Sequence, residues 1–486
     1  MHRIAAHPTV PVDRAAGSPL VLLAGAAVLL VHAAVPAALP IQLRLLAALP
    51  GAAACFLWWR YLAGREFERL PFLEYAITQV YLYWGLAAVT TRAEDLSSAT
   101  PRAWAGAVVA GVVVAAAYLL AHPVSRRLGA CAAGGLERLL PPTAPPLSTV
   151  VVLPWLAIAA AIHADVGAQV FPGSVYYAAQ TLGDYAPLLA AIAWRDLRRG
   201  GRSVWLVVCT IILSLAGMLT GMMEAAVQPV LLALTLYVAL RRKVPWRLLA
   251  AGVLIVVVVN PAKHRYRELA WEDALSRQEQ ERTTKDPRIA AERWAKALRD
   301  TWGPGNARRA GQGGGLASRL DELGLNARII DSVPGAFPHD RGRSWGYVAL
   351  SLVPRFLYPE KPDFTDVYND RFAVTFGFQT REETETSTSA FPLVADGYWN
   401  FGWPGIVFVA LACGVLIGLF AGLFRTTTWA MTAIGVSAFA QLHANSAMAL
   451  QMMGVVQHVV GLSVVVWITW AISVGVDAIR RGRARA

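Results

Sequence analysis

The sequence predicts an all-α, polytopic integral membrane protein with about 12 transmembrane helices and one large extracytoplasmic loop containing short helices. The chain of 486 residues is 56% hydrophobic and only 16% charged, which is too little polar surface for a soluble protein of this length. Apolar segments of about 20 residues, the length that crosses a hydrocarbon core, recur along it. Basic residues also alternate from loop to loop, as expected for cytoplasmic and outer loops in turn.

Each expected span is a nearly uncharged run bounded by charged or Pro/Gly-containing turns. The first five are rich in Ala, Val and Leu, with small residues that allow close helix packing. The twelve spans are expected near residues 18–39, 41–63, 72–90, 103–121, 147–163, 174–193, 203–219, 222–240, 246–260, 402–424, 428–446 and 453–476.

The arginines set the orientation. They gather in every second loop, and cytoplasmic loops are the ones that carry the excess of positive charge. Both termini are therefore expected in the cytoplasm, and the N-terminus is expected to run into an uncleaved first span. The basic groups are Arg60–Arg69, Arg126–Arg138, Arg195–Arg202, Arg241–Arg247, the single Arg425, and Arg480–Arg485.

This orientation divides the chain into three parts. Residues 1–260 form an N-terminal bundle of nine expected helices, residues 261–400 form the outer loop, and residues 401–486 supply the last three helices. The loop holds 20 basic and 20 acidic residues, so the formal charge of +12 comes entirely from the rest of the chain. The positive charge is thus an orientation signal, and no nucleic-acid partner is expected.

A few polar residues lie inside or beside the expected helices. Glu74 is interpreted as an interfacial carboxylate near Arg69. Asp184 needs a partner or a polar cavity. Glu224 either lines a sugar-binding cavity or complements a helix dipole. The four cysteines lack metal-ligand spacing and are not placed to form a disulfide in the outer loop.

The ninth span is expected to end at Asn260, and a basic cluster containing Arg265 and Arg267 follows at once. These side chains either reach out to lipid headgroups or bind an anionic ligand at the membrane surface, for which the guanidinium fork suits phosphate.

The outer loop is expected to contain two helices and a short apolar segment. Thr284–Thr301 has the period of an amphipathic helix, and a second helix is expected over Leu316–Ser332. Gly346–Phe356 is too short to span a membrane and contains Pro354, so it predicts a re-entrant or surface-lying segment. Such a segment would hold Arg355 and Lys361 at headgroup depth, whereas Arg319 belongs to the second helix.

Four motifs in this loop carry a resemblance to a known family. They are Val333-Pro334 after an Arg-bearing helix, Gly342-Arg343-Ser344-Trp345-Gly346, Pro354-Arg355-Phe356-Leu357-Tyr358-Pro359-Glu360-Lys361-Pro362, and Ala395-Asp396-Gly397-Tyr398-Trp399-Asn400-Phe401-Gly402-Trp403. Together they resemble the O-antigen polymerase family, the Wzy-type oligosaccharide repeat-unit polymerases.

The resemblance implies glycosyl transfer on the outer face of the cytoplasmic membrane. Such an enzyme joins a glycan on one polyprenyl diphosphate to the repeat unit carried by another. The expected partners are these donor and acceptor lipids, the bilayer and, as a candidate, a chain-length regulator. Metal-independent transfer without a cofactor is implied.

The chemistry needs cations for the departing diphosphate, contacts that orient the acceptor, and a base. Arg355 is the first candidate for the diphosphate. Asp396 is the candidate base, with His339 and Glu360 as alternatives, and it could equally cap the tenth helix or bind a sugar hydroxyl. His443 is expected to act in acid–base chemistry, to contact the diphosphate, or simply to bond a helix carbonyl. The expected substrate-binding residues are Arg265, Arg267, Arg319, Lys361, Tyr398, Asn400, Glu224 and Asn445.

Two questions stay open at this point. Asp363, Asp366 and Asp370 have oxygen atoms suited to Mg²⁺ or Ca²⁺, yet their spacing fits no known loop pattern, and solvated acids are the preferred interpretation. The polymerase also has two rivals, a ligase that moves a finished glycan to a lipid or protein, and a flippase. No paired halves with interrupted helices are evident, which disfavours a transporter.

Overall fold

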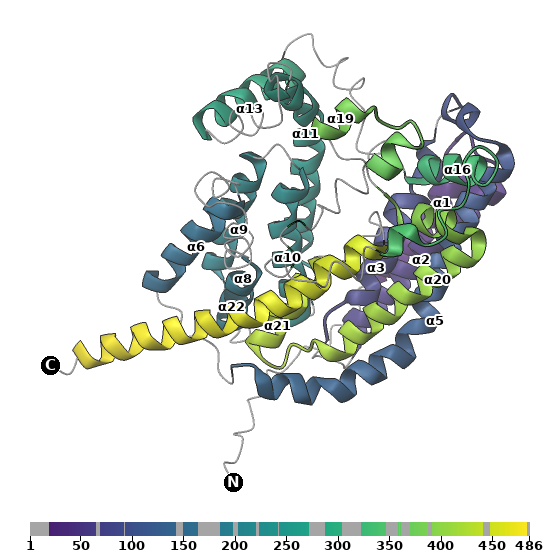
Figure 1. Ribbon diagram of the computed structural model, residues 1–486. Helices are drawn as coiled ribbons and strands as arrows, with labels where there is room; N and C mark the ends of the chain where they lie inside the picture. The colour runs from purple at the N-terminus through teal and green to yellow at the C-terminus, as the bar shows by residue number, and fades with distance from the viewer. Residues whose placement is uncertain are drawn as a thin grey trace.

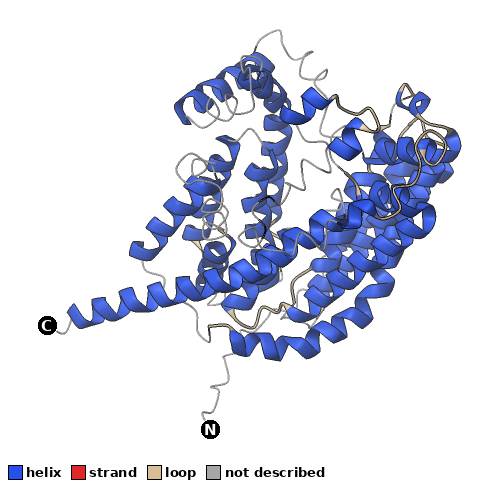
Figure 2. Cartoon of the chain, in the orientation of Figure 1, coloured by secondary structure: helices blue, strands red, loops and turns tan. Residues whose placement is uncertain are grey.

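Every regular element that the structure describes is helical, which confirms the all-α prediction for that part of the chain (Figures 1 and 2). The structure is a computed structural model. Its single sheet-like feature among the described residues is an isolated β-bridge between Arg69 and Arg425. The described residues are 19–64, 69–91, 93–141, 149–163, 185–197, 203–219, 223–241, 243–271, 287–303, 322–346, 358, 360, 370–386, 391–440 and 448–483.

Two long helices, α5 (Pro101–Leu139) and α20 (Leu393–Leu423), form the centre of one group. They approach closely because glycines line the contact. A Cβ atom built on Gly418 would lie 1.9 Å from Ser125 Oγ. We call this contact the glycine seam, and it comprises Gly129, Gly414, Gly418 and Gly422.

Shorter helices surround this pair, on the right of Figure 1. Thr100 caps the start of α5 by accepting from the Ala103 N–H, and its hydroxyl donates to Asp331 Oδ1 at 2.5 Å. This bond ties α5 to the last turn of α16. The surrounding elements are α1 (Pro19–Ala34), α2 (Ile41–Ala63), α3 (Phe72–Val80), the π-helical turn η1 (Tyr81–Gly85), α4 (Ala87–Thr90), the 3₁₀ turn η2 (Asp95–Ser98) and α16 (Glu322–Ser332).

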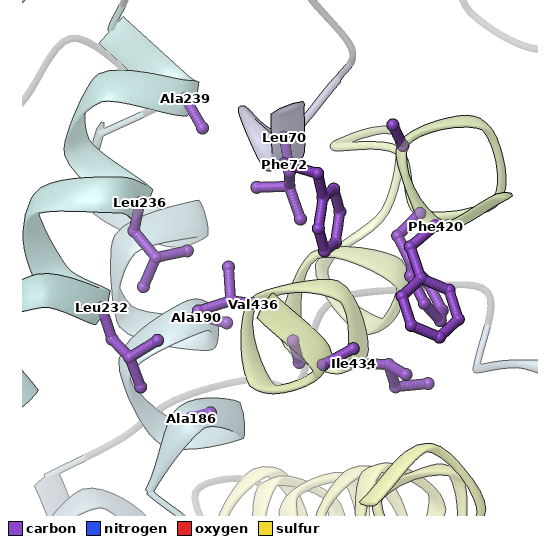
Figure 3. Packing of buried hydrophobic residues seen from close by; sticks show 14 of the residues in the cluster. Leu70, Phe72, Ala186, Ala190, Leu232, Leu236, Ala239, Phe420, Ile434 and Val436 are labelled. Carbon is purple, nitrogen blue, oxygen red and sulfur yellow. The ribbon is translucent and has the colours of Figure 1, made fainter. Parts of the chain in front are cut away.

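A second group lies on the left of Figure 1, and the C-terminal helices join the two. Figure 3 shows Val436 of α21 near Ala190 of α8 and Leu236 of α10, with Phe72 and Phe420 of the first group close by. The second group comprises α6 (Thr149–His163), α8 (Ala186–Leu197), α9 (Val204–Leu219), α10 (Met223–Arg241), α11 (Trp246–Trp271) and α13 (Pro287–Trp302). The C-terminal helices that join the two groups are α21 (Trp429–Ala440) and α22 (Met448–Arg483).

The prediction of twelve spans is corrected to four helices that are long and apolar enough to cross a membrane within the described chain. Most expected spans that are described do lie on helices, but six of the apolar helical stretches have only 10–17 residues. Two of these stretches, Ala225–Arg241 and Gly252–Lys263, lie within the longer helices α10 and α11. A stretch of 17 residues is about 26 Å long at 1.5 Å per residue, which is short of a hydrocarbon core. The four are Ile41–Ala63, Pro101–Leu139, Leu393–Leu423 and Gly461–Ile479.

Three boundaries in and around the expected outer loop were also tested. The ninth helix does not end at Asn260, because α11 continues through Pro261 to Trp271. The span expected to start near residue 402 corresponds to the second half of α20, since α20 begins at Leu393 but its backbone is not helical at Phe401 and Gly402. The amphipathic helix expected over Thr284–Thr301 is confirmed as α13.

Candidate functional site

The site is built on a break in α20. Phe401 (φ −143°, ψ 20°) and Gly402 (φ 64°, ψ −144°) are not helical. Pro404 helps to explain the position, because its ring nitrogen has no hydrogen for the Asn400 carbonyl four residues earlier. The two halves fold closely against each other, and a Cβ on Gly405 would lie 2.0 Å from the Gly397 carbonyl oxygen.

The carbonyls freed by the break receive hydrogen bonds from residues 339–346, which we call the clamp turn. The Asp340 N–H donates to the Trp399 carbonyl at 2.9 Å, and the Arg341 N–H donates to the Asn400 carbonyl at 3.2 Å. The Gly342 N–H donates to Asn400 Oδ1 at 2.8 Å. Buried carbonyls need such partners, so the clamp turn and the break stabilise one another.

Asp396 lies beneath the clamp turn and is completely buried. Its Oδ1 accepts from Ser344 Oγ at 3.3 Å and from Asn400 Nδ2 at 3.0 Å. The Trp345 indole N–H lies 3.2 Å from both carboxylate oxygens. Three donors on two chain segments therefore meet at one carboxylate, which fixes the clamp turn against the first half of α20.

A second carboxylate holds the clamp turn from the other side. Asp340 Oδ2 accepts from the Ser344 N–H at 2.9 Å, while Oδ1 forms an ion pair with Arg371. Arg371 belongs to the π-helical turn η4 (Asp370–Val374), and its guanidinium lies 5.9 Å from the Trp399 ring centroid. Asp340 thus connects three segments at the top of α20.

His339 is the half-buried histidine of the clamp turn, and its ring is oriented by the break. Nδ1 lies 3.2 Å from the Trp399 carbonyl oxygen. A carbonyl can only accept, so this contact assigns the hydrogen to Nδ1 and leaves a lone pair on Nε2 in the neutral ring. Among the described residues Nε2 has no hydrogen-bond partner, and the ring lies beside Gly402.

Exposed guanidinium groups accompany this histidine. Arg341 and Arg343 flank Gly342 in the clamp turn, and both are exposed. Arg341 has φ 54°, the one positive φ of a non-glycine residue in the described chain. A side chain in that conformation costs about 1 kcal/mol or more. Exposed Arg328 lies 6.0 Å from the Phe378 ring centroid, at the edge of the aromatic cluster beneath Trp399.

This geometry can be compared with known proteins. Residues 181–428 match the family described as a domain of unknown function (DUF8712). The chain belongs to that family. The match covers just over half of the chain and includes the clamp turn and the break in α20. The chain matches no curated protein and no solved structure.

The structure brings together only part of the predicted site. Asp396 and Asn400 share the buried network, and half-buried Tyr398 has its ring 6.3 Å from that of His339. Arg265 lies elsewhere, on α11, in an ion pair of 3.0 Å with Asp300. Its role in substrate binding stays a prediction.

The remaining predicted residues cannot be placed at the site. Arg267 belongs to α11 and Glu224 to α10, and the side chains of both lie outside the described part of the structure. Exposed Glu360 has no contact with the clamp turn among the described interactions. Glu74 pairs with Arg69 at 2.7 Å, as expected. The predicted residues outside the described part are Arg355, His443, Arg319, Lys361, Asn445 and Asp184.

Of the acids weighed as metal ligands, Asp363 and Asp366 lie outside the described residues, and Asp370 begins η4. Glu382, another acid that follows in the sequence, lies in the short helix α19 (Arg381–Thr386). The residues that the structure describes contain no group of three or more His, Cys, Asp or Glu side chains suited to holding a metal ion.

Asp340 and Arg371 were not singled out from the sequence, and Ser344 and Trp345 were quoted only as part of a motif. Their signal was the Gly-Arg-Ser-Trp-Gly pattern, in which glycine permits the positive φ of 81° at Gly342. The pattern indicated a turn but not its partner, because the contact spans more than fifty residues.

Proposed function

We propose that the protein is a membrane glycosyltransferase that polymerises polyprenyl-diphosphate-linked oligosaccharide repeat units. The observation that carries the proposal is the clamp turn, in which the Nε2 atom of His339 has no hydrogen-bond partner among the described residues and two exposed arginines, Arg341 and Arg343, follow within four residues. A base next to cations is what transfer from a diphosphate requires. The motif resemblance supports the same chemistry.

In the proposed reaction, an acceptor sugar hydroxyl attacks the anomeric carbon of the donor glycan. A new glycosidic C–O bond forms while the bond to the diphosphate oxygen breaks, and the diphosphate leaves with that electron pair. Nε2 of His339 takes the hydroxyl proton, and Arg341 and Arg343 offset the charge of the leaving group. Arg355, the first candidate from the sequence, remains a proposed further cation.

Asp396 takes a positioning role in this proposal. A base must reach the proton that it removes, but this carboxylate is fully buried and already accepts from Ser344, Trp345 and Asn400. It holds the clamp turn, and through that turn it orients His339. We further propose that the clamp turn faces the extracytoplasmic side of the cytoplasmic membrane, as the arginine distribution predicts.

The test is reconstitution of the full chain in liposomes with a lipid-linked repeat unit. Wild type is expected to form a ladder of products, and His339→Gln is expected to lower the rate about 100-fold or more. His163→Gln is the matched control, because His163 is another half-buried histidine with Nε2 bonded to a carbonyl, that of Ala225, at 2.7 Å. Equal loss in both variants would remove His339 from the reaction. A single transfer in place of a ladder would identify a ligase.

The break in α20 also favours one function of another class, since interrupted helices form the binding sites of many transporters. A flippase would move the lipid-linked glycan across the bilayer without forming a bond. Accessibility of the glycan to an added glycosidase, measured in the same liposomes, separates the two functions. Movement with no new glycosidic bond would replace the polymerase proposal.

A further inference from the structure

A second cationic site lies away from the clamp turn, at the corner between α11 and α13. α13 packs against α11 and lies over the end of α9 (Figure 1). The Tyr266 and Trp294 rings stack with centroids 4.5 Å apart and an interplanar angle of 15°. The Trp294 indole N–H donates to the Met218 carbonyl at 2.9 Å. These contacts hold α13 in one orientation.

One guanidinium nitrogen at this corner is buried and unsatisfied. Arg293 Nη1 has no hydrogen-bond partner among the described residues, although the atom is shielded from solvent. Burial raises the pKa of the Tyr266 phenol, and the charge of Arg293 opposes that rise, which places the guanidinium within electrostatic reach of the ring. A buried donor without an acceptor is unfavourable, so an acceptor from outside the chain would stabilise this corner.

The surroundings favour a negatively charged acceptor. The carboxylate of Asp300 on α13 is already paired with Arg265 at 3.0 Å. Lys263 is buried three residues before Tyr266, on the same face of α11. α13 carries four basic residues against two acidic ones, so the corner has an excess of positive charge. Exposed Trp302, at the end of α13, is a residue type enriched at membrane interfaces.

We infer that the α11–α13 corner binds the phosphate group of a membrane lipid, with Arg293 as the central donor. Arginine presents a planar fork that matches phosphate oxygens. Phosphate is also the acceptor that phospholipids supply where an apolar helix such as α11 leaves the hydrocarbon. This inference does not depend on the proposed transfer reaction.

The experiment measures thermal unfolding of the purified full chain in a neutral detergent. Wild type, Arg293→Gln and the control Lys296→Gln are each compared with added phosphatidylglycerol, a phosphate-free glycolipid and inorganic phosphate. Lys296 lies on the exposed side of the same helix, so its variant loses the same charge. Phosphatidylglycerol is expected to raise the Tm of wild type and Lys296→Gln by about 3 °C or more. Arg293→Gln is expected to lose at least half of that rise.

The three additives distinguish a lipid phosphate from free inorganic phosphate as the ligand. A rise with inorganic phosphate alone would support the site with a free phosphate as its ligand. An equal rise with the glycolipid, no rise in wild type, or the same rise in Arg293→Gln would overturn the inference.

If Arg293→Gln does not fold, Arg293→Lys keeps the charge and removes the fork. Native mass spectrometry then counts the phosphatidylglycerol retained by each protein. Retention by Arg293→Lys is expected to fall several-fold below that of wild type, and equal retention would contradict the inference.

Discussion

On either side of Gly402, helix α20 packs against two different kinds of surface. The second half meets α5 through the glycine seam, where backbone lies on backbone and the contact is one of shape. The first half meets the clamp turn through hydrogen bonds to two carbonyls, one carboxylate and one amide. A contact based on shape is disrupted by any added side-chain volume. A contact based on hydrogen bonds is disrupted more by the loss of a donor or acceptor than by a change in volume.

The largest effect is expected at the glycine seam. Gly418→Leu would place a side chain where Ser125 Oγ now lies 1.9 Å from the Cβ position. We expect a loss of more than about 3 kcal/mol in the free energy of unfolding, because the two helices must separate. Thermal unfolding in detergent measures it. Gly475→Leu is the control, since nothing lies within 4 Å of a Cβ at that position, and equal losses would show that the seam is not tightly packed.

A smaller effect is expected from Asp396→Asn, which keeps the shape and changes the hydrogen bonding. The amide has one acceptor oxygen in place of two, so some of the donors from Ser344, Trp345 and Asn400 lose their partner. We expect a loss of about 2 kcal/mol in unfolding free energy and a lower polymerisation rate. Glu94→Gln, in an exposed turn before η2, serves as the control. Unchanged stability and rate would mean that Asp396 does not hold the clamp turn.

Ser344→Ala removes one member of the same network and has a more modest expected effect. Its hydroxyl contacts both Asp396 and Asn400, and one lost hydrogen bond of this kind costs about 1 kcal/mol. Unfolding measurements are compared with those of Ser97→Ala, whose exposed hydroxyl bonds the Glu94 carbonyl and no other group among the described residues. A similar loss in both variants would argue against the network.

The smallest expected change in stability has the opposite sign. Arg341→Gly relieves the side-chain strain at φ 54°, worth about 1 kcal/mol, but increases the freedom of the unfolded chain, so a net gain of about 0.5 kcal/mol is expected. The KM for the lipid-linked donor is expected to rise because the guanidinium is lost. Arg343→Gly, whose φ is not positive, is expected to lose stability. A loss in Arg341→Gly would show that the backbone there is unstrained.

The sequence predicted the helical class, and it singled out the segment around Asp396 on which the candidate site is built. Both inferences rest on local patterns. Hydropathy identifies apolar helices, and a cluster of Asp, Tyr, Asn, Gly and Pro beside a membrane segment indicates a functional position. The break at Gly402 was not predicted, although Pro404 and two glycines eight residues apart were visible. Its cause is a contact with the clamp turn, and no local pattern reports such a distant partner. For the same reason the ion pairs of Arg265 and Arg371 could not be foreseen.

The length of α5 has a mechanical consequence. Its 39 residues correspond to about 58 Å at 1.5 Å per residue, roughly twice the thickness of a hydrocarbon core. Its first turn is tied to α16 by Thr100, and α16 packs against α20 beneath the clamp turn. A thinner or thicker bilayer tilts long helices, and a tilt of α5 carries α16 with it. Lipid chain length therefore becomes a variable that acts on the geometry around His339.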